Sequence, residues 1–183
     1  MNNIPKLNDI ILSENVKEEV NKNIGFMTDI IPEISFMIGF EHNHPHHDLD
    51  VYNHTLKALS NSKSDLKIRM ALLLHDIGKP FSYQDDGEIR HFYGHPKVSA
   101  EMTETILKRL GYEKEFISDI IYLVENHDKL IDTNNLDNNI EMVKKRLEMQ
   151  YADASAHRED KVKKRIDILD EIKRKLNNPN SNI

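Results

Sequence analysis

A histidine and an aspartate stand side by side where an apolar stretch of this sequence ends. His75 and Asp76 follow the apolar run 66–74, and Gly78 and Lys79 come directly behind them. An imidazole and a carboxylate at this position offer two metal-binding groups where a buried helix meets a loop. The alternative is that His75 is a hydrogen-bonded histidine favoured by the helix dipole, and that Asp76 is its solvated neighbour.

Three further polar residues interrupt apolar faces elsewhere in the chain. His54 lies in one apolar stripe, His127 continues another, and Asp153 stands among small residues. Each alone is more often a satisfied core group than a ligand. Because burying several polar groups without a shared partner is costly, one metal site that satisfies them together accounts for the whole set. The chain has no cysteine, so such a metal must be held by nitrogen and oxygen ligands.

Helical periodicity predicts most of the elements that must position these residues. Apolar residues recur at three- and four-residue steps over 16–31, 51–59, 116–127, 140–154 and 162–176. Almost no segment alternates as a strand does, so the expected fold class is all-α. The residues expected at helix boundaries are Ser13 and Pro32 for the first helix, Asp48 or Asp50 before the second, Gly78 and Pro80 after the buried helix, and Pro96 and Gly111 around the next. The segment 81–94 reads as a long loop with a turn at 85–87.

Length and charge limit the class of protein. A chain of 183 residues is the size of one domain, and no repeat or linker divides it. A formal net charge of −6 argues against an extensive nucleic-acid surface, although a small phosphate substrate remains possible beside a bound cation. No signal peptide or apolar run long enough for a membrane span is evident, so we expect a cytoplasmic protein.

Several short sequence motifs resemble those of a known family. The order His54, His75-Asp76, Asp153 resembles the defining pattern of the HD superfamily of metal-dependent phosphohydrolases. The words that resemble the HD domain attached to bacterial tRNA nucleotidyltransferases are HxxDVxxHT (47–55), LLHDIGKP (73–80), HFYGH (91–95), ENH (125–127) and ADA (152–154). The resemblance runs from about residue 44 to 157. No nucleotidyltransferase head and no basic tRNA-binding surface are evident, so we carry over the hydrolase domain and not CCA addition.

The resemblance implies a set of roles. One metal would be held by His54, His75, Asp76 and Asp153, and a second by His95 and His127 with Asp76 as the bridge. Imidazole and carboxylate ligands favour one or two divalent ions of Fe, Mn, Co or Ni over Mg. Asp76 and Lys79 are the candidate catalytic residues. Lys79 and His47 are the candidate contacts to a substrate phosphate.

The remaining histidines and the basic clusters receive plainer interpretations. His42, His44 and His46 are expected at the surface, while His91 and His157 are candidate supports for the ligands. The clusters 144–146 and 161–165 are expected to be solvated helix faces.

The resulting hypothesis is a metal-dependent hydrolase of a phosphate ester, such as a nucleotide or a 2′,3′-cyclic phosphodiester. Two alternatives stay open: a di-iron oxygenase of the same superfamily, and a non-catalytic module that binds a nucleotide or a protein partner. The expected organisation is a helical segment over 1–40, a single HD-domain bundle over 41–158, an amphipathic helix over 159–176 and a frayed tail over 177–183. The oligomeric state is left open.

Overall fold

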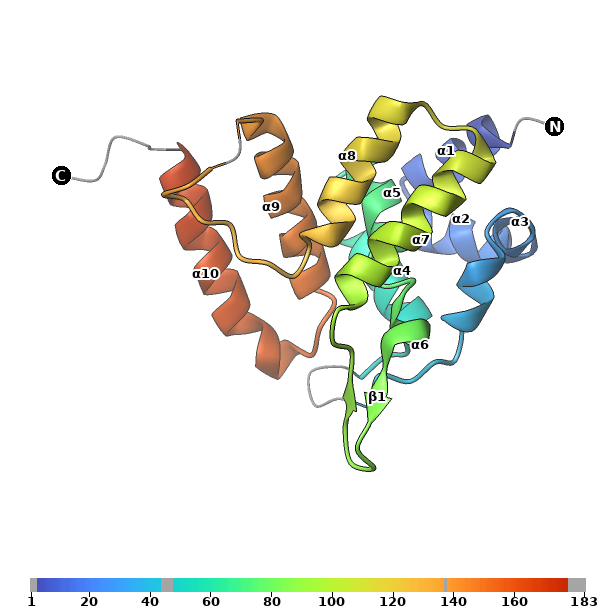
Figure 1. The fold of residues 1–183 in the computed structure, drawn as a ribbon, viewed down its shortest axis with the longest axis horizontal. Coiled ribbons are helices and arrows are strands. Elements are labelled where there is room, and N and C mark those ends of the chain that lie inside the picture. Colours follow the sequence, from blue (N-terminus) through green and yellow to red (C-terminus); the bar gives the residue numbers. More distant parts are fainter. Residues whose placement is uncertain (1–2, 44–47, 137, 178–183) are drawn as a thin grey trace.

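The computed structural model describes residues 3–43, 48–136 and 138–177, and helices dominate these ranges (Figure 1). The predicted all-α fold class is therefore confirmed. The helices, in chain order, are α1 (Ile4–Leu12), α2 (Val16–Lys22), α3 (Ile24–Ile30), the short 3₁₀ helix η1 (Pro32–Phe36), α4 (Val51–Ser60), α5 (Leu66–Leu74), α6 (Lys79–Ser82), α7 (His95–Leu110), α8 (Lys114–Glu125), α9 (Ile140–Ala154) and α10 (Glu159–Asn177).

Helix α5 forms the centre of the main hydrophobic core. It packs against α1, α4, α8 and α9, and its side chains from Ile68 to Leu74 are buried on every side. Its start is fixed by Asp65, whose carboxylate accepts hydrogen bonds from the backbone N–H groups of Lys67 and Ile68. Since α5 ends at Leu74, His75 and Asp76 lie directly after its C-terminal end and are buried inside the bundle.

The N-terminal region differs from its predicted form. One helix from Ser13 to Pro32 was expected, but α1 precedes Ser13, and the predicted helix is split between α2 and α3 at Asn23. The Asn23 side-chain amide donates to the Glu19 carbonyl oxygen at 2.9 Å, which offers the backbone an alternative to continued helix. Ser13 ends α1 instead of capping the next helix.

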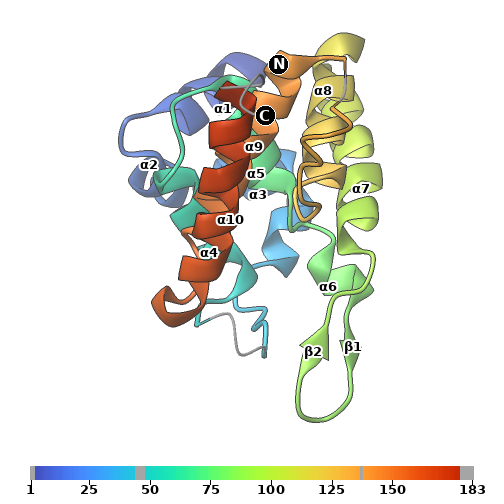
Figure 2. The same ribbon diagram turned by 90° about the vertical axis from the view of Figure 1, so that its left-hand side faces the viewer.

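A short β-hairpin lies within the segment predicted to be a loop. Strands β1 (Gln84–Asp85) and β2 (Arg90–His91) pair antiparallel and project from the helical body (Figures 1 and 2). The turn is held by the Asp86 carboxylate, which accepts from the backbone N–H groups of the two residues before β2. Gly78 and Pro80 follow the end of α5 as predicted, but Pro80 also lies in the first turn of α6, a short helix that was not predicted.

Helices α9 and α10 enclose a second, smaller hydrophobic cluster. Its buried members are Ile131, Val143, Leu147, Ala154, Leu169 and Ile172. Figure 1 shows α10 lying along α9 on the side away from α7. Of the predicted tail, only Asn177 lies within the described residues. The domain boundaries given above stay a prediction.

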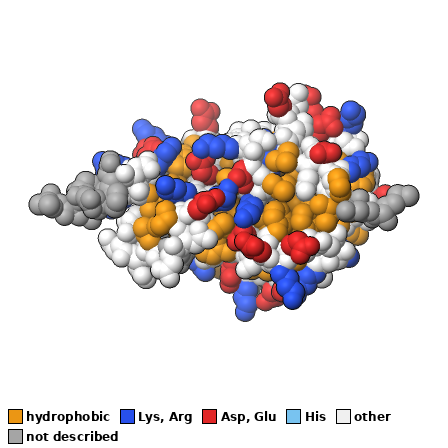
Figure 3. Space-filling view, turned by 90° about the horizontal axis from the view of Figure 1, so that it is seen from above, with side chains coloured by type: hydrophobic (Ala, Val, Ile, Leu, Met, Phe, Trp, Pro, Cys, Tyr) orange, Lys and Arg blue, Asp and Glu red, His pale blue; other side chains and the backbone are white. Residues whose placement is uncertain are grey.

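The surface carries mixed charge on the face drawn in Figure 3, where acidic and basic side chains are interspersed. Within the described ranges, no helix combines the length and the apolar character that a membrane crossing requires.

Candidate metal centre

Six side chains from five helices converge at one end of α5. His54 lies on α4, and Asp153 lies in the last turn of α9. The other four stand at helix ends: His75 and Asp76 after α5, His95 at the first position of α7, and His127 two residues beyond α8. All six side chains are buried. The structure therefore brings together every residue predicted to bind metal, across 99 positions of sequence between His54 and Asp153.

The first group of candidate ligands surrounds one oxygen of Asp76. Nε2 of His75 lies 3.3 Å from Asp76 Oδ2, and Nε2 of His54 lies 3.8 Å from it. Asp153 Oδ1 lies 2.9 Å from Nε2 of His54 and 3.5 Å from Nε2 of His75. Two imidazoles and two carboxylates thus present their ligand atoms to one small volume.

The second group surrounds the other oxygen of the same carboxylate. Nε2 of His95 lies 3.3 Å from Asp76 Oδ1, and Nε2 of His127 lies 3.7 Å from it. The sets His54–His75–Asp76 and Asp76–His95–His127 each have ligand atoms within 4.8 Å of one another. Because Asp76 belongs to both, its position suits a carboxylate that bridges two cations.

A repeated backbone contact fixes the orientation of three of these imidazoles. Nδ1 of His75, His95 and His127 lies 2.6, 2.9 and 2.6 Å from the carbonyl oxygen three residues earlier in the chain. A carbonyl oxygen only accepts, so each Nδ1 carries the proton and donates it. In the neutral imidazole, Nε2 is then the atom left to bind a metal, and all three Nε2 atoms face Asp76.

The contacts inside the cluster favour a bound cation. Nε2 of His95 and Nε2 of His127 lie only 3.2 Å apart, so two electron pairs face each other when both rings are neutral. Nε2 of His75 and Oδ1 of Asp76 are buried without a hydrogen-bond partner among the described residues, while Asp76 Oδ2 is contacted by the Lys79 ammonium. Such groups are costly to bury alone. One or two divalent cations would satisfy them, so the donor set fits the expected cofactor.

The surroundings hold the pKa values of Asp76 and Asp153 well below the usual range and act on the imidazoles in different directions. Burial alone would raise the pKa of Asp76, but His75 and Lys79 hold it well below its usual range. Burial lowers the pKa of His54 and of His127. Burial also acts to lower the pKa of His75, but Asp76 and Asp153 outweigh it and raise that pKa to about 10. A cation bound at Nε2 of His75 would replace the proton that these carboxylates attract.

Lys79 lies inside this cluster rather than at its edge. It begins α6 and is buried, with Nζ 2.7 Å from Asp76 Oδ2. Nζ also lies 3.1 Å from Nε2 of His42 and 5.4 Å from the centre of the Phe92 ring. The ammonium group is thus held beside the candidate bridging carboxylate. Its predicted contact with a substrate phosphate stays a prediction.

His42 is the clearest correction to the sequence analysis. It was expected at the surface but is buried, with Nδ1 donating to the Leu49 carbonyl oxygen at 2.8 Å. A β-bridge between Glu41 and Asp50 turns this segment back onto the domain and carries His42 inward. Burial and the Lys79 charge lower the pKa of His42 to about 3. His44, His46 and His47 lie outside the described residues, so the predicted role of His47 is open.

The two candidate supporting histidines differ in position. Nδ1 of His157 lies 3.1 Å from the Asp153 carbonyl oxygen, and its ring centre lies 5.1 Å from that of His54. It therefore packs beside ligand candidates, and its supporting role stays a prediction. His91 instead pairs with Asp86 across the hairpin, with Nε2 3.1 Å from the carboxylate.

Asp128 is a candidate ligand that the sequence analysis missed. Its two carboxylate oxygens lie 3.4 Å from Nε2 of His95 and 3.4 Å from Nε2 of His127. Its side chain is half exposed, so it stands at the solvent side of the cluster. Its place directly after His127, just beyond a helix end, is the one sequence signal that points to it.

The loop that carries His127 and Asp128 is held by two buried side chains of α9. Arg146 donates to the carbonyl oxygens of Asn126 and Lys129, and Gln150 donates to that of His127 at 2.9 Å. The prediction that 144–146 is a solvated face is thus wrong for Arg146. This residue fixes the loop instead of facing solvent.

A hollow of about 500 Å³ gives solvent and small molecules access to the cluster. It is lined by Asp76, Lys79, Arg90, His91, Phe92, Tyr93, Gly94, His95, Pro96, His127, Asp128, Asp153 and His157. Cationic, aromatic and carboxylate groups therefore share one opening. Such a site suits an anionic substrate with a planar group.

Comparison with known proteins identifies the pattern. The model of the HD domain family matches residues 46–172, more than half of the chain. A CC-adding tRNA nucleotidyltransferase of Thermus thermophilus is 31% identical over 113 residues, and an A-adding tRNA nucleotidyltransferase of Deinococcus radiodurans is 35% identical over 111 residues. A multifunctional CCA protein of Nitrosococcus oceani is 29% identical over 114 residues.

These similarities cover only part of each relative. They span 58%, 57% and 60% of this chain, but 26%, 25% and 28% of the three relatives. The chain thus spans about a quarter of their length. The resemblance predicted from the sequence words is confirmed.

Proposed function

This chain belongs to the HD domain family, and from that premise we propose that it hydrolyses a phosphate ester with the help of one or two divalent cations. The proposed substrate is a nucleotide or a 2′,3′-cyclic phosphodiester. The observation that carries the proposal is the position of Asp76. One carboxylate faces both groups of histidines and the Lys79 ammonium, and it lines a hollow that reaches solvent.

The residues of the site would have separate roles in such a reaction. His54, His75, Asp76 and Asp153 would hold one cation, and Asp76, His95 and His127 the other. A bound cation supplies a Lewis acid and a water molecule of lowered pKa. Lys79 would neutralise charge that develops on the phosphoryl oxygens. Asp128, at the solvent side, is placed to orient a water or accept a proton.

A phosphate-release assay tests this proposal. The purified protein is supplied in turn with Mn²⁺, Fe²⁺, Co²⁺, Ni²⁺ and Mg²⁺ and given a panel of nucleotides and cyclic phosphodiesters. We expect phosphate or monoester release with at least one ion, at equal rates with and without oxygen. Absence of hydrolysis with every ion, in protein whose metal content has been verified, would contradict the proposal. Turnover that requires oxygen would favour oxygenase chemistry instead.

A further inference from the structure

A second hollow adjoins the candidate metal centre, between the end of α9 and the first half of α10. Its volume is about 310 Å³. It is lined by Asp128, Asp153, Ala154, His157, Lys161, Val162, Lys164, Arg165 and Ile168. Three of these, Asp128, Asp153 and His157, also line the larger hollow. The two hollows therefore meet at the candidate ligands, and a molecule bound at the metal centre can extend into the second one.

One face of α10 gives this hollow its basic character. Lys161, Lys164, Arg165 and Ile168 follow helical spacing and share one side of the helix. At 1.5 Å per residue, the stripe from 161 to 168 is about 10 Å long. These residues line the hollow together with Asp128, Asp153 and His157 of the metal centre. Val162, Ala154 and Ile168 add an apolar wall.

Lys161 and Lys164 are exposed, as predicted for a solvated face, but Arg165 differs. Its side chain is partly buried, and a guanidinium nitrogen donates to the Asp128 carbonyl oxygen at 3.3 Å. The prediction of a solvated 161–165 cluster is therefore wrong for Arg165. The contact ties α10 to the loop that carries His127 and Asp128. A guanidinium keeps further N–H donors in a planar fork, which suits a phosphate group.

The carboxylates around the hollow do not cancel the positive charge of its lysines and arginine, so the hollow attracts anions. Asp160 lies 3.6 Å from Lys161 and also pairs with Arg158. Asp153 is engaged by His54 and His75 within the metal centre. Asp128 is the remaining carboxylate on the lining, which also carries Lys161, Lys164 and Arg165. With cations bound at the centre, the local charge would be more positive still.

We propose that the hollow between α9 and α10 binds a second phosphate group of the substrate, one nucleotide away from the phosphate that is hydrolysed. The substrate class is then a nucleotide with two separate phosphates, such as a nucleoside bisphosphate or a dinucleotide. This inference rests on the function proposed above and narrows it. The apolar wall would contact the sugar or base between the two phosphates.

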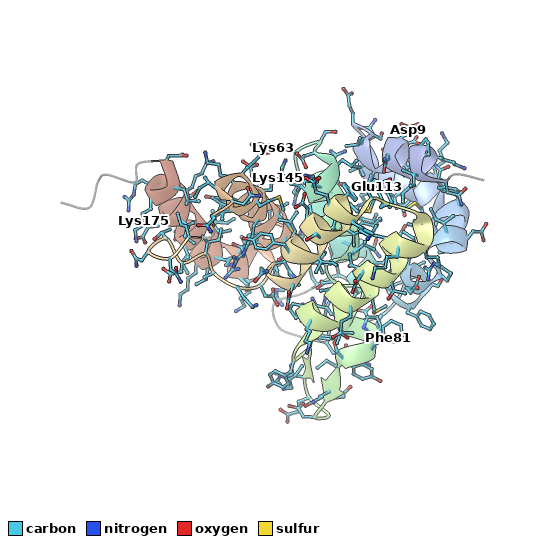
Figure 4. All side chains as sticks on the ribbon, turned by 45° about the horizontal axis from the view of Figure 1, so that its top comes forward. Asp9, Lys63, Phe81, Glu113, Lys145 and Lys175 are labelled. Atoms are coloured by element: carbon cyan, nitrogen blue, oxygen red, sulfur yellow. The ribbon has the colours of Figure 1, made fainter. Side chains whose placement is uncertain are left out.

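Matched substrates and matched variants test the inference. Adenosine 3′-monophosphate and adenosine 3′,5′-bisphosphate differ by one phosphate, and each is offered to the Mn²⁺-loaded full chain. The double variant K161Q/K164Q removes two charges from the hollow and leaves Arg165 in place. The control K163Q/K175Q removes two charges from the same helix at positions that do not line the hollow. Figure 4 shows Lys175 near the C-terminal end of α10.

Two readouts separate this inference from the proposed function. One is calorimetric binding of each nucleotide, and the other is kcat and KM for phosphate release. We expect wild type to bind the bisphosphate roughly tenfold more tightly than the monophosphate, the scale of one charge-assisted hydrogen bond. K161Q/K164Q should lose this preference with little change in kcat or in monophosphate binding. The control should retain it.

The possible results distinguish failure of the subsite from failure of the proposed function. If neither nucleotide is hydrolysed but the binding preference depends on Lys161 and Lys164, the subsite stands and the proposed function fails for these substrates. If the monophosphate is hydrolysed but wild type binds both nucleotides equally, the subsite is overturned while the proposed function stands. Equal loss of preference in K161Q/K164Q and in the control would also overturn it, because the effect would then be general charge.

Discussion

The ammonium group of Lys79 and the carboxylate of Asp76 form the tightest charged contact at the candidate site, at 2.7 Å. Removing each partner should have a different consequence. D76N removes the charge shared by both ligand groups, so it should lose metal whichever reaction the site performs. K79A should keep its metal, because a cation is not a ligand. It should lower kcat roughly 10²–10³-fold, the scale for removing one group that stabilises developing charge.

Metal content by elemental analysis and phosphate-release kinetics check this pair of variants. Lys97, an exposed lysine on α7, provides a control as K97A, for which unchanged kinetics are expected. K79A with full activity would remove Lys79 from the mechanism. K79A that lost its metal would assign the lysine to the architecture of the cluster.

Gly78 has no room for a side chain, although its backbone conformation is ordinary. A Cβ atom there would lie 2.6 Å from the Ser99 backbone nitrogen and 3.1 Å from the His95 carbonyl oxygen. Both atoms belong to the first turns of α7, so G78A must push α7 away from α6. We expect a loss of about 1–3 kcal/mol in unfolding free energy, as for overpacking. Because His95 moves with α7, metal should also bind more weakly.

Gly25 in α3 supplies the matched control for G78A. A Cβ atom at Gly25 meets nothing within 4 Å, so G25A should be neutral or stabilise by about 0.5–1 kcal/mol. Urea unfolding and metal titration of both variants test the difference. Equal stability of G78A and G25A would contradict the proposed close contact between α6 and α7.

Asp65 determines how the central helix begins. Its carboxylate caps α5 and also contacts Lys145 of α9. Figure 4 shows Lys145 close to Lys63. Burial would raise the pKa of Asp65, but these partners lower it below its usual value. A lowered folded pKa means that the stabilisation is complete above the unfolded pKa, about 4, and is lost as pH falls through the folded value.

Two substitutions separate the cap from the charge. D65A removes both and should cost about 1 kcal/mol at pH 7. D65N keeps a capping oxygen and should cost less at pH 7, while removing the same acid dependence. Urea unfolding at pH 7 and at pH 3 measures both effects. A wild type that loses no stability relative to D65N between these pH values would refute the role of the charge.

At the scale of helices, periodicity predicted most elements but not their interruptions. Helix α7 is bounded by Pro96 and Gly111, as expected, and Asp50 caps α4. At the break the Asn23 side chain donates to Glu19, and in the hairpin turn the carboxylates of Asp85 and Asp86 accept backbone hydrogen bonds. Side-chain hydrogen bonds of this kind compete with the backbone hydrogen bonds of a helix, and the free-energy difference between the two is small. The spacing of apolar residues does not reveal which one prevails.

In the candidate site, too, some contacts could be predicted from the sequence and others could not. His75 and Asp76 are adjacent in sequence, and helix ends dictate where they point, so their proximity could be predicted. His42 reaches the cluster only because a bridge from Glu41 to Asp50 closes its loop. Arg165 reaches Asp128 only because α10 folds back along α9. The contacts of His42 with Lys79 and of Arg165 with Asp128 each span 37 positions of the chain, and no local pattern encodes them.

The ligand candidates lie on, or directly beyond the ends of, five helices: α4, α5, α7, α8 and α9. At the scale of the whole molecule, a bound cation would therefore link most of the bundle. Bound metal should stabilise the native state alone, because the unfolded chain holds no preformed site. At a free concentration 100-fold above Kd, the gain is about 2.7 kcal/mol. For a chain of this size, the melting temperature should then rise by roughly 5–10 °C.

Thermal unfolding with and without metal tests this linkage. The metal-free protein, prepared with a chelator and verified by elemental analysis, should melt at the lower temperature and regain the loss when Mn²⁺ is restored. H75A lacks a ligand at the centre of the cluster, so its melting temperature should respond little to Mn²⁺. H91A provides the control, since His91 lies on the hairpin and pairs with Asp86, and it should respond as wild type does. A wild-type melting temperature that chelation leaves unchanged would show that the cluster holds no metal that matters to the fold. A response in H75A equal to that of wild type would place the stabilising metal elsewhere.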